Sequence, residues 1–309
     1  MAKNLDETTL QAVHKAHELR RPPRYLVSAM LAGAFIGVGE VLLLTAASPL
    51  VASHSAATKL VEGAVFPLAI TMVMFAGAQL FTSNVMVMLF GALSGRTGVR
   101  DLVGSWSLSL FGNFLGALGF GAMVHASGVT SSGPAQAMLK ELVAGKNALD
   151  GGQIFWRAVL CNMLVCLGIW MFTRAQGDGA KSFVLWLPVF VFVAAGFEHC
   201  VANMSLYGLA IFDGSASFAD LFRNLAFSVP GNIVGGGLLV AGAYWFSTGA
   251  RRAEFGRRDA VAAGEPVVPV VPVVSEAPAV SEVPAGGEPV APVAPVAAAA
   301  QELVGSDQR

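Results

Sequence analysis

Long apolar stretches alternate with short polar segments through most of this chain. Six windows each hold about 20 or more mostly apolar residues, the length that an α-helix needs to span a bilayer. The windows are residues 25–51, 62–94, 102–126, 154–174, 182–212 and 222–248. The windows 62–94 and 182–212 are too long for one span, and glycine and polar residues interrupt each in the middle. Unwound backbone at membrane depth is tolerated only where it lines a cavity or is buried in protein, so the pattern predicts an all-α membrane protein with broken second and fifth helices.

The predicted membrane domain, residues 25–248, divides into two halves of three windows each, which must therefore be inverted relative to each other. Gly112-Asn-Phe-Leu-Gly116 in the third window matches Gly231-Asn-Ile-Val-Gly235 in the sixth. Small residues four apart let helices approach closely, and Asn113 and Asn232 are candidates to bond across that contact as structural support. Glycine packing alone, without a bonded asparagine, is the simpler alternative.

Positive charge differs between the two ends of the windows. The side that carries both termini holds more arginine and lysine: Arg20, Arg21, Arg24, Arg96, Arg100, Arg174, Lys181, Arg251, Arg252, Arg257 and Arg258. The positive-inside rule then predicts a multi-pass protein of the cell inner membrane with both termini in the cytoplasm.

The two ends of the chain are expected to lie outside the membrane. Residues 1–24 are polar, lack the apolar core of a cleavable signal, and predict a cytoplasmic N-terminal segment. Residues 249–309 predict a cytoplasmic tail rich in Pro, Val and Ala; from about residue 259 its regularly spaced prolines favour disorder over a packed core.

Composition supports the membrane class and excludes others. The chain is 55% hydrophobic and 13% charged, whereas soluble domains carry roughly 25% charged residues. A net charge of -1 gives no basis for binding nucleic acid. The three cysteines lie apart in apolar windows and predict no metal site, and the chain has no His-Glu-x-x-His and no phosphate-binding Gly-Lys-Ser/Thr loop. We therefore expect no enzyme activity and no cofactor.

Ionisable residues inside the apolar windows are the candidates for function, because they are costly at membrane depth. His199 and Glu198 stand in the break of the fifth window. An imidazole there faces a pathway, or it only bonds a carbonyl of a neighbouring helix. Glu40 lies in the first window, where it would be neutral, pair within the bundle or line a subunit contact; the sequence does not choose among these.

Three segments resemble signatures of the formate/nitrite transporter family, in the family's order, across residues 25–248. They are Gly77-Ala-Gln-Leu-Phe-Thr-Ser83, Ala158-Val-Leu-Cys-Asn-Met-Leu-Val-Cys-Leu167 and Gly196-Phe-Glu-His-Cys-Val-Ala-Asn203. Residues 41–48 and 174–181 look more like the nitrite branch than the formate branch. Two departures are Gln79, where the family usually has an acidic or serine residue, and Glu40, where it has an apolar one.

The resemblance implies an aquaporin-like fold of six spans in the lipid bilayer, assembled as a homopentamer with one pore per protomer. It also implies nitrite and formate as substrates. Carried over residue by residue, the central gate would use Thr82 and His199, and Asn162 and Asn203 would offer polar contacts near it. Lys146 would lie towards the outer mouth, where its positive charge would attract anions. The apolar constrictions on either side of the histidine would be Phe66, Ile70, Leu80, Phe81, Val165 and Phe192.

Some of these residues have alternative interpretations. Thr82 would cap the half-helix after the break, Lys146 would be an exposed loop lysine, and Glu198 would accept hydrogen bonds from a neighbouring protomer or from the broken loop.

An anion in an apolar constriction meets a desolvation penalty far above what one hydrogen bond returns. We therefore expect His199, oriented by Thr82, to polarise or protonate the anion, so that protons accompany nitrite. The alternatives are a channel for formate or another weak acid, and a neutral-solute channel of the aquaporin type. The latter usually carries an Asn-Pro-Ala motif, which this chain lacks at its breaks.

Overall fold

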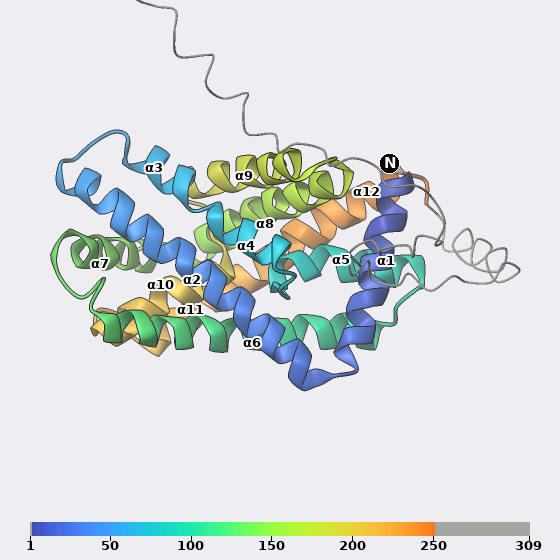
Figure 1. Cartoon of the computed structure of the whole chain (residues 1–309), viewed down its shortest axis with the longest axis horizontal. Helices are drawn as coiled ribbons and strands as arrows, with labels where there is room; N and C mark the ends of the chain where they lie inside the picture. The colour runs from blue at the N-terminus through green and yellow to red at the C-terminus, as the bar shows by residue number, and fades with distance from the viewer. Residues whose placement is uncertain (1, 251–309) are drawn as a thin grey trace, which may run out of the picture. The chain divides into compact units, whose positions relative to one another are not determined.

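The computed structural model of the chain describes residues 2–250, all of whose regular structure is helical. The predicted tail, apart from its first two residues, lies outside this range. The first half contains α1 (Ala2–Leu19), α2 (Pro22–Ala52), α3 (Thr58–Val65), α4 (Leu68–Phe75), α5 (Phe81–Ser94) and α6 (Val99–Ser127) (Figure 1). The second half contains α7 (Gly133–Asn147), α8 (Gly151–Arg174), α9 (Asp178–Ala194), α10 (Cys200–Asp213), α11 (Phe218–Ile233), the π-helical segment η1 (Val234–Gly242) and α12 (Ala243–Ser247).

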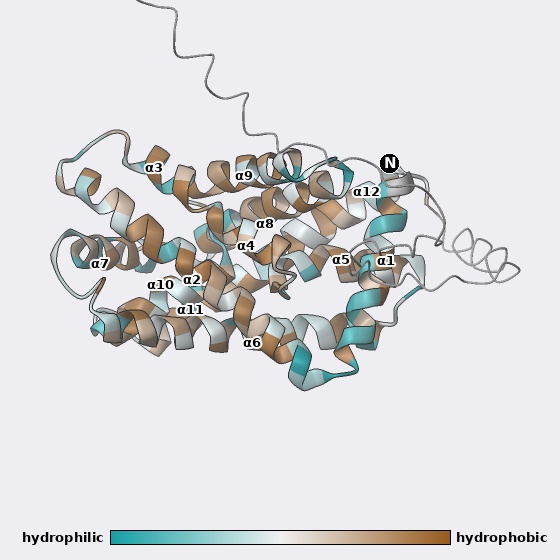
Figure 2. Ribbon diagram, in the orientation of Figure 1, coloured by the Kyte–Doolittle hydropathy of each residue, from teal (hydrophilic) through white to brown (hydrophobic). Residues whose placement is uncertain are grey.

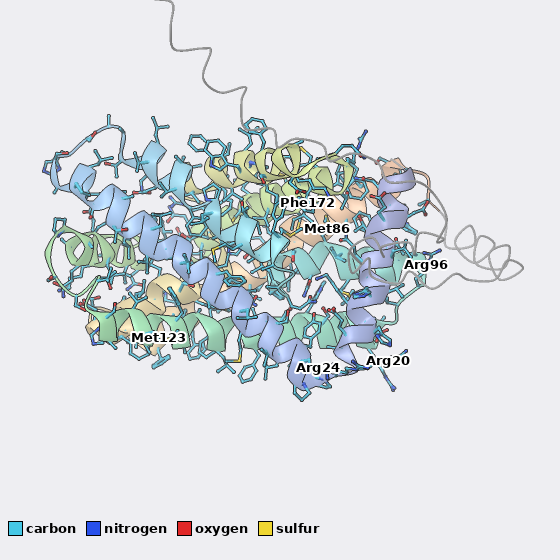
Figure 3. All side chains as sticks on the ribbon, in the orientation of Figure 1. Arg20, Arg24, Met86, Arg96, Met123 and Phe172 are labelled. Atoms are coloured by element: carbon cyan, nitrogen blue, oxygen red, sulfur yellow. The ribbon has the colours of Figure 1, made fainter. Side chains whose placement is uncertain are left out.

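Within residues 2–250, five helical stretches are long and apolar enough to cross a membrane. They are Pro22–Ala52, Thr58–Phe75, Val99–Ser127, Gly151–Arg174 and Phe218–Ser247. Two shorter apolar helices, α5 and α10, follow the breaks. Large apolar side chains remain exposed on the outside of the bundle, such as Met123, which is 63% exposed (Figure 3). A multi-pass membrane protein accounts for this surface, because lipid or a second subunit covers it.

Both predicted helix breaks are present, and both have the same backbone geometry. α4 and α9 are each followed, two residues after their last helical residue, by a glycine with left-handed backbone: Gly77 at φ +73° and Gly196 at φ +69°. The next N–H in each case donates to a carbonyl five residues back, as in a Schellman cap: Ala78 N to Val73 O and Phe197 N to Phe192 O, both at 3.0 Å.

The first broken window contains a further interruption that the sequence analysis missed. α3 ends at Val65 and α4 begins at Leu68, with Pro67 between them. Proline has no N–H to donate to the carbonyl four residues back, so the helical hydrogen bonding is interrupted here although Phe66 and Pro67 keep helical backbone dihedrals.

Close helix contacts hold each half together, at the glycine motifs that matched in the sequence. α2 packs along α6, and α8 packs along α11 and η1 (Figure 1). A Cβ on Gly116 would lie 1.8 Å from Met30 O, and one on Gly235 would lie 2.1 Å from Val159 O. Only glycine fits these contacts, because the clashing atoms belong to the backbone of the partner helix.

The N-terminal segment forms α1, which packs against α5, α6 and α8. Its buried face includes Leu5, Thr8 and Ala12, and Asn4 Nδ2 donates to Trp170 O at 2.9 Å. Polar residues cover much of the rest of α1 and the turn into α2 (Figure 2), where Arg20 and Arg24 lie exposed (Figure 3). α1 is thus an amphipathic helix docked on one end of the bundle.

Candidate functional site

The site is built around the two breaks, where α5 and α10 begin with extended residues. Leu80 and His199 take the N-cap positions, at φ -90° and φ -101°. Each half-helix therefore points an N-terminus, with its partial positive charge and unpaired N–H groups, into the protein interior.

Asn113 and Asn232 hold the two breaks with equivalent hydrogen bonds. Asn113 Nδ2 donates to Ala29 O at 2.8 Å and to Gln79 O at 2.9 Å, while its Oδ1 accepts from Phe81 N at 2.8 Å. Both asparagines are fully buried.

In the second half, Asn232 Nδ2 donates to Ala158 O at 2.8 Å and to Glu198 O at 3.0 Å. Its Oδ1 accepts from Cys200 N at 2.9 Å. Each asparagine thus satisfies a carbonyl of the break, a carbonyl of the neighbouring helix and the first N–H of the half-helix, groups that would otherwise be buried without partners.

Thr82 and His199 meet across the two breaks. Thr82 Oγ1 lies 3.0 Å from His199 Nε2, and both side chains are buried. The other ring nitrogen, Nδ1, accepts the N–H of Ala202 at 3.1 Å and so caps α10. A backbone N–H can only donate, so Nδ1 carries the lone pair and the proton of the neutral ring is on Nε2, from which it points at the Thr82 oxygen. Thr82 therefore binds the histidine, and the N-cap of α5 is Leu80, without a side-chain cap.

Glu198 is buried among donors of its own chain. Lys146 Nζ donates to Oε1 at 2.7 Å, and Oε2 accepts from Asn203 Nδ2 at 2.7 Å and from Asn224 Nδ2 at 3.1 Å. Its side chain is 1% exposed and that of Lys146 is 21% exposed. Lys146 lies on α7 and is paired, so the interpretation as an exposed loop lysine is wrong.

Two cavities flank the Thr82–His199 contact. The first, of about 370 Å³, lies beside α1 and is lined by residues that include Lys15, Glu18, Gln79 and Ser83; we call it the α1-side cavity. The second, of about 90 Å³, lies between α2, α3, α7 and α10 and is called the α7-side cavity. Its lining residues include Glu40, Glu62, Phe66, Lys146, Phe192, His199 and Asn203.

The predicted constriction residues divide into two groups. Phe66 and Phe192 line the α7-side cavity; their rings meet edge to face at 6.1 Å, and Phe192 stacks on His199 at 5.8 Å. The other four are buried but line neither cavity: Ile70, Leu80, Phe81 and Val165.

Asn162 contributes to the scaffold of the site and does not line either cavity. Its Nδ2 donates to Thr82 O at 3.2 Å and to Asn232 O at 2.7 Å. It thereby links the carbonyl of Thr82 to α11. Asn203, by contrast, lines the α7-side cavity.

The α1-side cavity has a lysine that the sequence analysis did not single out. Lys15 Nζ donates to Gln79 Oε1 at 2.7 Å, and Gln79 Nε2 donates to Glu18 Oε2 at 2.6 Å. Gln79 and Lys15 thus correspond to Glu198 and Lys146 at the other break. Burial lowers the pKa of Lys15 to about 8, and the carboxylate of Glu18 offsets part of this effect.

Asn224 and Glu62 were also missed. Asn224 lies on α11 four residues before Ser228, whose hydroxyl donates to Asn224 Oδ1 at 3.1 Å. Glu62 pairs with Lys59 at 2.8 Å, and its side chain is 4% exposed. Polar pairs spaced four or three residues apart in apolar segments are the signal that would have found both.

Comparisons with known proteins agree with this geometry. The model of the family "Formate/nitrite transporter" matches residues 2–246. The chain is 37% identical over 243 residues to a probable formate transporter of Methanothermobacter thermautotrophicus, covering 72% of this chain and 88% of that one. It is 33% identical over 231 residues to the nitrite transporter NirC of Escherichia coli (strain K12), covering 74% and 84%.

A solved structure described as a pentameric formate channel with formate bound superposes with a TM-score of 0.66. Its sequence is 29% identical, and the match covers 75% of this chain and 99% of that one. The family model spans both helix breaks, including the histidine in the second. This chain therefore belongs to the formate/nitrite transporter family.

Proposed function

We propose that this chain forms a homopentameric channel of the cell inner membrane that passes small monovalent anions of weak acids, with nitrite as its main substrate. The observation that carries the proposal is the Thr82–His199 contact between two cavities, formed where two half-helices begin. Broken helices with their N-termini at the centre are typical of sites that bind anions in membrane transporters.

The equivalent bonds of Asn113 and Asn232 support two inverted repeats of three spans, with one broken helix in each. The first repeat would run through α2, α3 to α5 and α6, and the second through α8, α9 with α10, and α11 with its continuation. Positive charge on the α1 side supports a cytoplasmic location of both termini. The α7-side cavity would then open to the outside.

We propose a part in anion passage for each of these residues, supported by the geometry of the site. Lys146, at the α7-side cavity, attracts the anion, although its pairing with Glu198 reduces the net charge that the anion meets. His199 Nε2–H donates a hydrogen bond to the anion in place of Thr82. The aromatic rings of Phe66 and Phe192 exclude water, so passage as the neutral acid avoids the desolvation penalty of the ion.

The source of the proton follows from the tautomer. A neutral ring whose only N–H is on Nε2 can donate a hydrogen bond, but to give up that proton it must first take another at Nδ1. Nδ1 is occupied by the Ala202 N–H. We therefore propose that His199 polarises the anion, and that the transferred proton comes from the aqueous side together with the anion.

Flux into liposomes containing the purified protein tests this function. Uptake of nitrite, formate and chloride is compared at mildly acidic and mildly alkaline pH for wild type, His199→Asn and His125→Asn. His125 is exposed at the end of α6 and is the matched control. We expect uptake of nitrite and formate to rise at low pH, to collapse in His199→Asn and to persist in His125→Asn. Equal chloride passage at both pH values in all three proteins would contradict the proposal.

Formate is the second candidate substrate, favoured by the 37% identity to a protein named a formate transporter. The same liposomes decide between the two. Uptake is compared at equal concentrations of the two neutral acids. If nitrite uptake exceeds formate uptake, nitrite is the main substrate; if formate uptake exceeds nitrite uptake, formate is the main substrate.

A further inference from the structure

Glu40 lies on α2 with its side chain in the wall of the α7-side cavity, where the family is expected to have an apolar residue. It is 6% exposed, and it lines the same cavity as Lys146, His199 and Asn203. Among residues 4–250, whose side chains the structure describes, none forms a hydrogen bond or a salt bridge with the Glu40 carboxyl group.

The other charged groups around this cavity already form pairs. On α3, Glu62 pairs with Lys59 at 2.8 Å, and Lys146 of α7 pairs with Glu198 of the second break at 2.7 Å. His199, from the same break, is in its neutral form. No further ionisable side chain lines this cavity from α9 or α10, within the part of the chain that the structure describes.

The state of Glu40 therefore sets the net charge of the cavity. Two lysines balance two glutamates. An ionised Glu40 leaves one excess negative charge, and a protonated Glu40 leaves none. An excess charge at the wall of a small, largely apolar cavity is weakly screened. The charge of an ionised Glu40 would repel an anion in the same cavity in which Lys146 attracts it.

We infer that Glu40 is a proton-binding site of the α7-side cavity, and that its protonation admits the anion to His199. The inference rests on the proposed function for its consequence in transport, whereas proton binding by Glu40 can be measured without it. The cavity, about 90 Å³, has room for a small anion or a few water molecules beside the carboxyl group.

The first measurement is exchange of labelled formate across liposomes at equal pH on both sides, from about pH 5 to about pH 8.5. Wild type is compared with Glu40→Gln and with Glu40→Leu, which places the expected apolar kind of residue there. Glu141→Gln is the matched control, because Glu141 is exposed on α7 and its loss removes the same charge outside the α7-side cavity.

The readout at each pH is the exchange rate of the mutant divided by that of wild type. This ratio cancels the effect of pH on the concentration of the neutral acid in solution. For both Glu40 variants we expect a ratio near one at the acidic end, rising to at least about threefold at the alkaline end. For Glu141→Gln we expect a flat ratio. A flat ratio for both Glu40 variants overturns the inference.

The second measurement is infrared difference spectroscopy of the reconstituted protein between acidic and alkaline pH. We expect a carboxylic-acid carbonyl band that disappears at alkaline pH in wild type and is missing from Glu40→Gln. A wild-type pH response that is unchanged in Glu40→Gln overturns the inference. If wild-type liposomes exchange neither formate nor nitrite, the proposed function is wrong, and the infrared band still decides whether Glu40 binds a proton.

Discussion

The contact of Lys146 with Glu198 brings a partly exposed cation to a carboxylate that is almost fully buried. Removing two charges from water is costly, and their attraction repays that cost only when further hydrogen bonds satisfy the ions. Asn203 and Asn224 supply those bonds to Glu198. Losing the lysine alone would leave the carboxylate buried without its counterion.

We expect Lys146→Gln to lower the free energy of unfolding by about 2 kcal/mol, less than for a fully buried pair because Lys146 keeps contact with water. Glu198→Gln should have a similar effect, and the double mutant should lose less than the sum, with a coupling of at least about 1 kcal/mol. Thermal unfolding of the detergent-solubilised variants measures this.

Lys140→Gln on the same helix is the control for the loss of a lysine. The Lys140 side chain is 51% exposed, and its Nζ lies 3.8 Å from Asp213 Oδ2. We therefore expect Lys140→Gln to change the free energy of unfolding by no more than about 0.5 kcal/mol. Additive effects of the two mutations in the Lys146–Glu198 pair would contradict the coupling.

At the scale of elements, the helix breaks depend on close packing between neighbouring helices. Asn113 can reach Gln79 O and Ala29 O together only because α6 approaches α2 closely. The glycines of the motif permit that approach, which brings the Asn113 side chain within hydrogen-bonding distance of both carbonyls.

Gly116→Ala should therefore be severe, because the added Cβ would meet Met30 O at 1.8 Å. We expect a loss of more than about 3 kcal/mol in stability, or failure to assemble, since backbone atoms cannot move aside alone. Gly119→Ala, on the same helix with no atom within 4 Å of the added Cβ, should be neutral or stabilise by up to about 1 kcal/mol. Similar thermal unfolding midpoints for the two variants would show that the motif does not control packing.

The docking of α1 should depend on pH through Lys15. The pKa of Lys15 in the folded protein is about 8, below its ordinary value of 10.5. Between these values the unfolded chain holds a proton that the folded chain has lost, so stability rises with pH in this window. The penalty for burying the charged amine is thus fully present below about pH 8.

We expect the difference in thermal unfolding midpoint between wild type and Lys15→Gln to shift in favour of wild type as the pH rises above about 8. Measuring the difference removes the effect of other groups that titrate in the same range. A difference that stays constant up to pH 10.5, the ordinary value, would contradict the role of burial at Lys15.

At the scale of the whole molecule, exposed apolar side chains cover helices that also hold the site. Examples are Phe111, Phe222 and Leu238, which are 53%, 55% and 66% exposed. In a pentamer, part of this surface would lie between subunits and the rest in lipid.

Native mass spectrometry of the protein released from mild detergent should give a complex of five chains of 32.0 kDa each. Cross-linking in the native membrane before extraction is the control against loss of subunits in detergent. A dominant monomer in both measurements would contradict the pentamer.

The sequence by itself determined the helical class, the two broken windows and the family. These features depend on local patterns, since the length of an apolar run and the glycines that interrupt it act on the residues beside them. The pairing of Thr82 with His199 was predicted from the family resemblance alone, because no local pattern in the sequence indicates that these two residues meet.

Only the tertiary structure decided which partner each polar group has. Thr82 and His199 are 117 residues apart in sequence, and the capping bond to Ala202 selects the ring nitrogen that faces the threonine. The structure also placed Lys15 against Gln79 and Asn224 against Glu198. Within the described part of the chain, it left the Glu40 carboxyl group without a partner in the cavity that Lys146 lines. The physical reason is that a buried polar group bonds to whatever helix packing brings within about 3 Å, and that packing depends on the whole chain.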